Sequence, residues 1–99
     1  MKVVFLITLY VLCCGGLLFA QTTSNGQRLY VQSCASCHDA HSTMHKAGPG
    51  LKGYYGGHHP IPVDAQVRVI IAKGKGTMPG FSSFSPAQMN DLIAYLKTL

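Results

Sequence analysis

Two cysteines and a histidine lie close together in the segment CASCH, at residues 34–38. In a helical turn, a spacing of three residues brings the two sulfur atoms to one side, and the next position places an imidazole beside them. A chain this short builds only a marginal hydrophobic core, and such chains often need a disulfide, a metal or another staple. We therefore expect Cys34, Cys37 and nearby histidines to hold the group that stabilises the fold.

The first twenty residues have the features of an export signal. Lys2 gives a positive start, residues 3–12 are almost entirely apolar, and Ala20 is a small residue at a plausible cleavage site. We predict a cleaved signal peptide over residues 1–20 and a single domain over residues 21–99.

Three alternatives remain open at this end of the chain. A cut after Gly16 fits the small-residue preference better, because Cys14 and Gly16 would then occupy the third and first positions before the cut. If residues 3–20 were retained, this apolar stretch of eighteen residues would be nearly long enough to span a bilayer. Lipid modification of Cys14 is the third alternative, although the residues before it match such a signal poorly.

The charge of the predicted domain is moderately basic. Residues 21–99 contain seven lysines and arginines and three aspartates, which gives a net charge of +4. The basic residues form no run and do not interleave with aromatic residues, so a nucleic-acid partner is not expected. An acidic protein partner, attracted by electrostatic steering, fits this charge equally well.

The residues after the signal predict a helix followed by a long loop. Ser24 or Asn25 can cap a helix over residues 24–37, a segment without proline. Glycine and proline crowd residues 45–62, which predicts a loop with at most a short helical turn near residues 51–55.

Two further helices are expected in the second half of the chain. Residues 62–74 carry a stripe of apolar side chains at helical spacing, although their β-branched content leaves a strand open. The members of this stripe are Val63, Val67, Ile70 and Ile71. Gly74 and Gly76 stop the segment. Ser85 can cap a last helix that begins at Pro86. The apolar side of that helix comprises Met89, Leu92, Ile93 and Leu96.

Three interpretations of the cysteines predict different chemistry. A CxxC pair in an exported protein can form a redox-active disulfide. A zinc site would need two further ligands, which His41 with His45, or His58 with His59, could supply. The histidine directly after Cys37 favours a third interpretation, because CxxCH is the attachment motif of c-type haem. In that motif both thiols are linked to the ring, and the histidine ligates the iron.

Three motifs occur in an order that resembles one family. CASCH at residues 34–38 is followed by GPGL at 48–51 and GTMPGF at 76–81, and then by a short capped helix that contains Tyr95. Together they resemble the class I cytochromes c, and the resemblance covers residues 24–99. It implies an all-α cytochrome c fold, in which three or four short helices surround one covalently attached haem c.

The resemblance also implies roles for individual residues. Cys34 and Cys37 resemble the thioether anchors, and His38 resembles the proximal iron ligand. The carbonyl of Pro49 would accept the proton on the other nitrogen of that histidine. Met78 resembles the distal ligand, so the implied metal ligands are His38 and Met78. The family's small and aromatic residues at the crossing of the first and last helices match Gly26, Tyr30 and Tyr95.

Other side chains leave alternatives open for the distal position. Met78 could instead fill a gap in the core, which is the usual role of a lone methionine. The glycines and the proline beside it favour a loop that presents its sulfur to the iron. His58 or His59 could replace Met78, but exposed loop histidines are the expectation there and at His41 and His45.

An iron with both axial positions filled predicts electron transfer rather than catalysis. With His38 and Met78 as ligands, neither substrate nor dioxygen can bind without displacing one of them. The resemblance thus implies an exported electron carrier, not an enzyme, that passes single electrons between redox proteins, in the periplasm of a Gram-negative cell. A haem subunit docked to a larger oxidoreductase, and an open-haem gas sensor or enzyme, are the alternatives.

Four lysines close to these motifs are candidates for orienting an acidic redox partner, and ordinary solvated charge explains them equally well. They are Lys46, Lys52, Lys73 and Lys75. Membrane association is expected only if the N-terminal segment is retained. Without haem, the chain is expected to be largely unfolded.

Overall fold

The computed structural model describes residues 2–57 and 60–99, and the side chains of residues 18–57 and 60–99. Within these residues the chain forms three helices and no strand. The helices are α1 (Lys2–Ser33), α2 (Asp64–Lys73) and α3 (Pro86–Leu96). The all-α fold predicted from the sequence is therefore confirmed.

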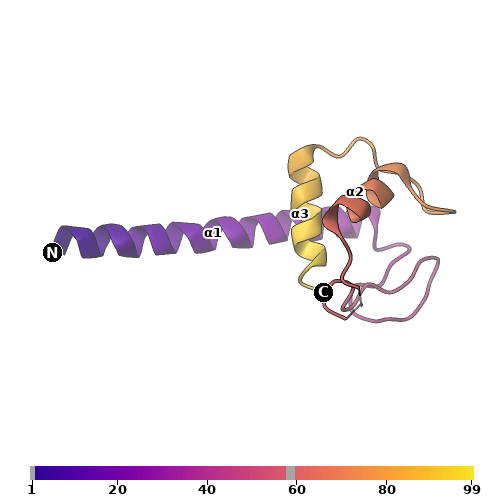
Figure 1. The fold of residues 1–99 in the computed structure, drawn as a ribbon, viewed down its shortest axis with the longest axis horizontal. Helices are drawn as coiled ribbons and strands as arrows, with labels where there is room; N and C mark the ends of the chain where they lie inside the picture. Colours follow the sequence, from indigo (N-terminus) through magenta and orange to yellow (C-terminus); the bar gives the residue numbers. More distant parts are fainter. Residues whose placement is uncertain (1, 58–59) are drawn as a thin grey trace.

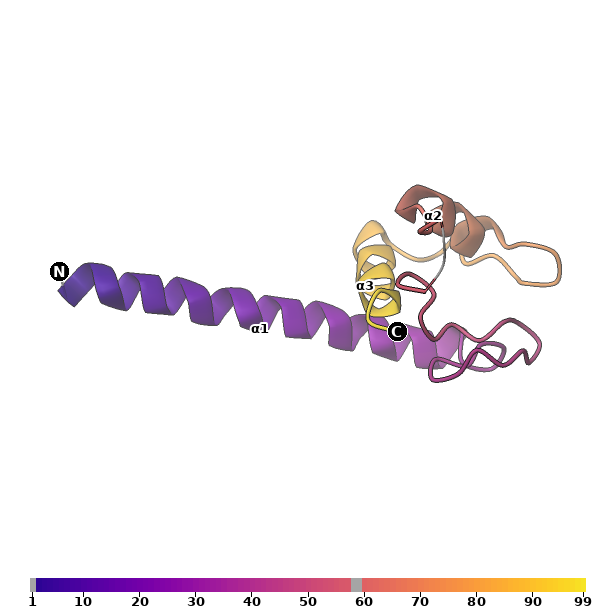
Figure 2. The ribbon, with the colours of Figure 1, turned by 60° about the horizontal axis from the view of Figure 1, so that its bottom comes forward.

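α1 extends well beyond the other elements. The molecule measures 60 Å along its longest axis and 28 and 23 Å along the other two. Figure 1 shows the N-terminal part of α1 pointing away from a small globular part, in which α3 crosses the C-terminal part of α1. Seen from a second direction, α2 and the loops also gather at this end (Figure 2). No helix among the described residues is long and apolar enough to cross a membrane.

The first helix begins much earlier than the sequence predicts. The expected start is Ser24 or Asn25, whereas α1 continues through both residues. The hydroxyl groups of Thr22 and Thr23 each donate to a carbonyl four residues back, at 3.1 Å. The side-chain oxygen of Asn25 accepts from two residues of the same helix. Polar side chains that often cap a helix are therefore satisfied inside this one, and the cap prediction is wrong.

α1 also ends earlier than predicted, at Ser33 instead of Cys37. The carbonyl of Tyr30 accepts from the backbone N–H groups of both Cys34 and Ala35, at 2.8 and 3.0 Å, which closes the last turn. One further turn follows, in which the N–H of His38 donates to the carbonyl of Cys34 at 2.9 Å. The predicted one-turn spacing of the two cysteines and the histidine is thus kept beyond the end of the helix.

The crossing of α1 and α3 forms the centre of the core. Gly26 is buried, and a side chain at this position would collide with the backbone of Asp91 and the Cβ of Tyr95. The rings of Tyr30 and Tyr95 pack beside it with their centroids 5.4 Å apart. The prediction that Gly26, Tyr30 and Tyr95 lie at the helix crossing is confirmed.

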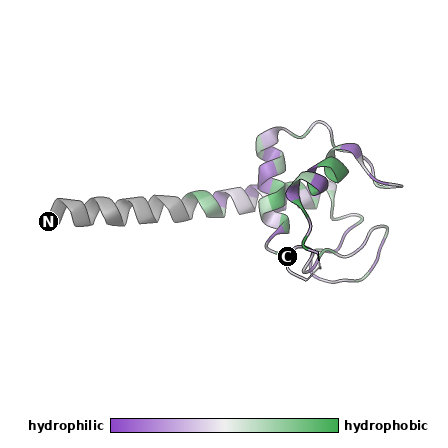
Figure 3. Ribbon diagram, in the orientation of Figure 1, coloured by the Kyte–Doolittle hydropathy of each residue, from purple (hydrophilic) through white to green (hydrophobic). Residues whose placement is uncertain are grey.

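The apolar stripe in residues 62–74 forms a helix and not a strand. α2 buries Val67 and Ile71, as the helical spacing predicts, but Val63 precedes the helix and is 55% exposed. Apolar and polar segments alternate around α2 and α3 (Figure 3). Among the described residues, side-chain contacts link α2 to α3 and to Lys97, the residue that follows α3. Arg68 Nη2 donates to Asn90 Oδ1 at 2.6 Å, and Lys97 Nζ lies 2.7 Å from the carboxylate of Asp64.

α3 follows the prediction closely. Ser85 caps it and Pro86 opens it, and the side chains of Met89, Leu92, Ile93 and Leu96 are buried. The cap is reciprocal, because the N–H of Gln88 donates to the Ser85 hydroxyl at 3.1 Å and the N–H of Ser85 donates to the Gln88 side chain at 2.9 Å. This capping box satisfies two backbone donors that the helix itself leaves free.

Replacing Ser85 with alanine is expected to destabilise the protein by about 1 kcal/mol, because one of these donors loses its acceptor. For a domain of this size the melting temperature should fall by about 4–8 °C per kcal/mol. Differential scanning calorimetry measures the shift. Ser82→Ala is the control, because Ser82 is exposed and lies outside the helices. Equal melting temperatures for the two variants would contradict the capping role.

Candidate functional site

The imidazole of His38 is held in a defined orientation. Its Nδ1 lies 2.8 Å from the carbonyl oxygen of Pro49. A carbonyl oxygen can only accept, so Nδ1 must carry a proton and donate, and in the neutral ring Nε2 is then the nitrogen with a free lone pair. This hydrogen bond also makes the ring a better donor to a metal. The nitrogen of His38 that could bind a metal is therefore Nε2.

The absence of a side chain at Gly48 allows the His38 ring to pack against the loop. A Cβ at this position would lie 2.5–3.0 Å from the Cε1, Nδ1 and Nε2 atoms of His38, closer than real Cβ atoms come to such neighbours. The ring therefore packs directly on the backbone of the loop. The sequence did not predict this role of Gly48. Its place in the GPGL motif, directly before Pro49, is the one sequence feature that could have indicated it.

Gly48→Ala is expected to push the His38 ring away from Pro49 and to destabilise the protein by about 1–3 kcal/mol, as overpacking commonly does. A denaturant titration followed by far-ultraviolet circular dichroism measures the change. Gly56→Ala is a matched control, because a Cβ at Gly56 meets no atom within 4 Å. Similar midpoints for the two variants would argue against the close packing of His38 on Gly48.

The two cysteines are partly buried and free, with no disulfide between them. Burial raises the pKa of the Cys34 thiol to about 11, and the neighbouring Cys37 adds to the effect. The attacking cysteine of a thiol-disulfide centre needs the opposite environment, one that lowers its pKa and provides a thiolate at neutral pH. The surroundings of Cys34 therefore disfavour the redox-disulfide interpretation.

Met78 lies on a tight turn after α2. Its backbone pairs with that of Lys75 through hydrogen bonds of 3.1 and 3.0 Å. Gly74 and Gly76 adopt φ angles of 80° and 59°, a region that favours glycine, and so allow the chain to turn at the end of α2. Met78 is only partly buried, whereas Met89 is buried in the core at 8% exposure. The core-filling role therefore belongs to Met89 rather than to Met78.

The two halves of the candidate site come from different segments. Figures 1 and 2 show the turn after α2 and the loop after α1 both projecting at the end of the molecule opposite the N-terminus. The segment around His38 and the segment around Met78 thus lie on the same side of the helix crossing.

Among the described residues, the other imidazole and thioether groups of the loop after α1 are exposed to solvent. His41, Met44 and His45 are exposed, as expected for loop residues, and Met44 is 74% exposed. His58 and His59 lie outside the described residues. Within the described part of the chain, no group of three or more His, Cys, Asp or Glu side chains could hold a metal ion. The zinc interpretation thus finds no assembled ligand set there.

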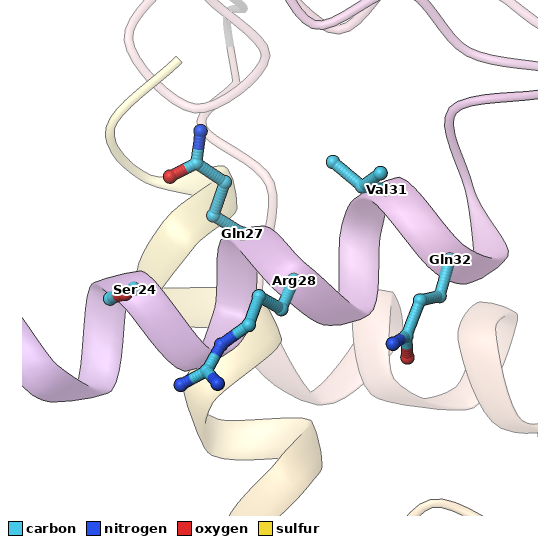
Figure 4. Close-up of a pocket in the computed structure, with 5 residues that line it drawn as sticks. All are labelled: Ser24, Gln27, Arg28, Val31 and Gln32. Atoms are coloured by element: carbon cyan, nitrogen blue, oxygen red, sulfur yellow. The ribbon is translucent and has the colours of Figure 1, made fainter.

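A shallow depression on α1 contains none of the predicted site residues. Figure 4 shows its five lining side chains, which all come from the one helix. They are Ser24, Gln27, Arg28, Val31 and Gln32. Because four of the five are polar and they lie on one helix face, we assign this depression no part in the site.

The comparison with known proteins identifies the family. Residues 21–96, more than half of the chain, match the family model described as "Cytochrome C oxidase, cbb3-type, subunit III". No solved structure matches the chain. The match agrees with the all-α fold and with the resemblance to small c-type cytochromes that CASCH, GPGL and GTMPGF indicate. The chain therefore belongs to this family of c-type cytochrome domains, whose shared chemistry is haem-based electron transfer.

Proposed function

We propose that this chain is an exported monohaem electron carrier, in which His38 and Met78 ligate the iron and Cys34 and Cys37 bind the haem covalently. The observation that carries the proposal is the 2.8 Å hydrogen bond from His38 Nδ1 to the Pro49 carbonyl. It fixes the tautomer in which Nε2 is free to bind iron, directly after the two thiols that would be attached.

The residues present fit a c-type haem. Two free thiols stand one turn apart, the imidazole that follows them has its ligating nitrogen free, and a soft thioether is presented on a separate turn. A bound haem would supply an iron that gains and loses one electron. The role of His38 and Met78 would be to keep both axial positions filled in both oxidation states, so that little rearranges on transfer.

This ligand set favours a carrier over an enzyme. Substrate, dioxygen or peroxide would have to displace Met78 or His38 before reaching the iron. The thioether sulfur raises the reduction potential relative to a site with two histidine ligands. Both effects suit a protein that accepts and donates electrons and makes no bonds.

The proposed location is the periplasm or another compartment outside the cytoplasm. The positive start at Lys2, the apolar residues 3–12 and Ala20 support a cleaved signal peptide over residues 1–20. Membrane association would follow only if this segment were retained.

Basic side chains beside the Met78 turn support an acidic redox partner. Lys73 and Lys75 are exposed and have no acidic partner among the described residues, whereas Lys97 is paired with Asp64 at 2.7 Å. Charges left unpaired next to the proposed haem ligand can steer an acidic protein toward it. Lys46 and Lys52, in the loop that contains Pro49, would extend this basic surface.

Lys75→Glu is expected to slow electron transfer to an acidic redox partner about tenfold at low salt, with the difference shrinking as added salt screens the charges. Stopped-flow mixing with such a partner measures the rate. Arg28→Glu changes the net charge equally, and Arg28 lies on α1 in the separate depression of Figure 4. Equal rates for the two variants would show that only overall charge matters.

A second candidate is a haem subunit that stays docked to one oxidoreductase. The family description, which names a subunit of an oxidase, favours it. Purification from the native membrane and soluble fractions separates the two functions. A carrier should be recovered alone, and a docked subunit should bring its enzyme with it.

Spectroelectrochemical titration of the purified protein tests the electron-carrier function. The proposal predicts one reversible one-electron transition of a covalently bound haem, with no change in ligands between the oxidised and reduced states. A protein that contains no covalent haem would contradict it.

A further inference from the structure

His38 is held at its backbone as well as at its ring. Its N–H donates to the carbonyl of Cys34 at 2.9 Å, and its Nδ1 donates to the carbonyl of Pro49 at 2.8 Å. A third contact reaches its carbonyl oxygen, which accepts from the hydroxyl of Tyr30 at 2.6 Å. No other donor to this oxygen occurs among the described residues.

Tyr30 is itself among the most firmly packed side chains of the molecule. It is 2% exposed, and its ring lies 5.4 Å from that of Tyr95, where α1 and α3 cross. Gly26, one turn earlier on α1, lets the two helices approach so closely. The hydroxyl of Tyr30 is therefore held in a fixed position. Its hydrogen bond to the His38 carbonyl links the peptide of His38 to the crossing of α1 and α3.

We propose that Tyr30 is a positioning residue for His38: its buried hydroxyl fixes the carbonyl of the proximal ligand, so that the orientation of the imidazole over the haem is set by the α1–α3 crossing. This inference rests on the proposed function, in which His38 ligates the iron. It adds a residue of α1 that acts through the backbone carbonyl of His38 and thereby controls how the ligand is presented.

The environment keeps this hydroxyl available as a donor. A phenol hydroxyl carries its proton throughout the neutral range, and this one is buried against the ring of Tyr95. Because a partly buried carbonyl that loses its donor is unfavourable, the peptide of His38 is expected to shift if the hydroxyl is removed.

Tyr30→Phe removes the hydroxyl and leaves the ring in place, so it tests the proposal in the haem-loaded protein. Tyr95→Phe is the matched control, because it removes a hydroxyl from the other ring of the same pair, which makes no hydrogen bond to His38. Two readouts separate positioning from general stability. They are the NMR shift pattern of the haem methyl groups in the oxidised protein, which reports the plane of the histidine ring, and the reduction potential.

The proposal predicts that Tyr30→Phe changes the methyl shift pattern and alters the one-electron equilibrium constant with a fixed partner about threefold or more. At 59 mV per tenfold change, threefold corresponds to about 30 mV. Tyr95→Phe should leave both quantities unchanged. Results for Tyr30→Phe that match those of the unsubstituted protein would overturn the proposal, whatever its effect on the melting temperature.

If the Tyr30→Phe variant cannot be produced as a folded protein, the proposal can be tested on the unsubstituted protein. The proton of the Tyr30 hydroxyl should exchange slowly with solvent and show a through-space NMR signal to residue His38. A hydroxyl that exchanges rapidly would overturn the proposal. If instead the unsubstituted protein lacked covalent haem, the proposed function would fail, which is a distinguishable result.

Discussion

Replacing Cys34 and Cys37 together with alanine is expected to give a colourless protein that has lost most of its folded structure. The described core is small: its buried side chains number ten, and Leu92 is the largest that is fully buried. A domain of about 80 residues has little stability to spare, and a covalently held group that fills its interior is the staple that such domains need.

The loss is measured by absorbance in the visible range and by far-ultraviolet circular dichroism of the exported protein. Ser36→Ala is the control, because Ser36 lies between the two cysteines and is exposed. It should retain both colour and helix content. A double cysteine variant that folds with the helix content of the unsubstituted protein would show that haem is not the staple.

Met78→Ala is expected to open the distal side of the iron. In the unsubstituted protein both axial positions are expected to be filled, so carbon monoxide should not bind. In the variant it should bind to the reduced protein and shift the Soret band. The reduction potential should fall by roughly 0.1 V or more. Axial ligands vary the reduction potential of haem over a range of about 0.8 V, so a change of this size is expected.

Met44→Ala is the matched control for this variant, because Met44 is 74% exposed and belongs to the loop on the His38 side. Its spectrum and potential should not change. If Met78→Ala behaved like Met44→Ala, another residue would have to be the distal ligand.

The elements that sequence alone predicts well are those whose signals are local. Ser85, Pro86 and the apolar side of α3 lie within twelve consecutive residues, and each contributes to the same helix. The turn that carries Cys34, Cys37 and His38 is also local, as its spacing shows. Short-range capping and periodicity therefore suffice for these parts of the fold.

The ends of α1 show where local signals fail. Ser24 and Asn25 are good caps, but a helix that continues through them satisfies the neighbouring polar groups by backbone and side-chain hydrogen bonds. Val63 fits the apolar period of α2 and yet remains 55% exposed. Propensity and period describe which residues can begin or line a helix, whereas tertiary packing decides which of them do.

The contacts around His38 could be predicted only in part. The resemblance to cytochromes c supplies Pro49, because the proline stands in a motif. The packing of the ring on Gly48 and the bond from Tyr30 depend on how α1, α3 and the following loop meet, and no pattern in the sequence encodes those distances. Residues that position a ligand from another element are thus the part of the site that needs a structure.

The most direct test of the account is the visible spectrum of the reduced, unsubstituted protein before and after adding carbon monoxide. If His38 and Met78 fill both axial positions, the c-type spectrum should not change on addition of the gas. A shifted Soret band would contradict the account, because the distal position would be open and a gas sensor or enzyme would then explain the protein better than an electron carrier.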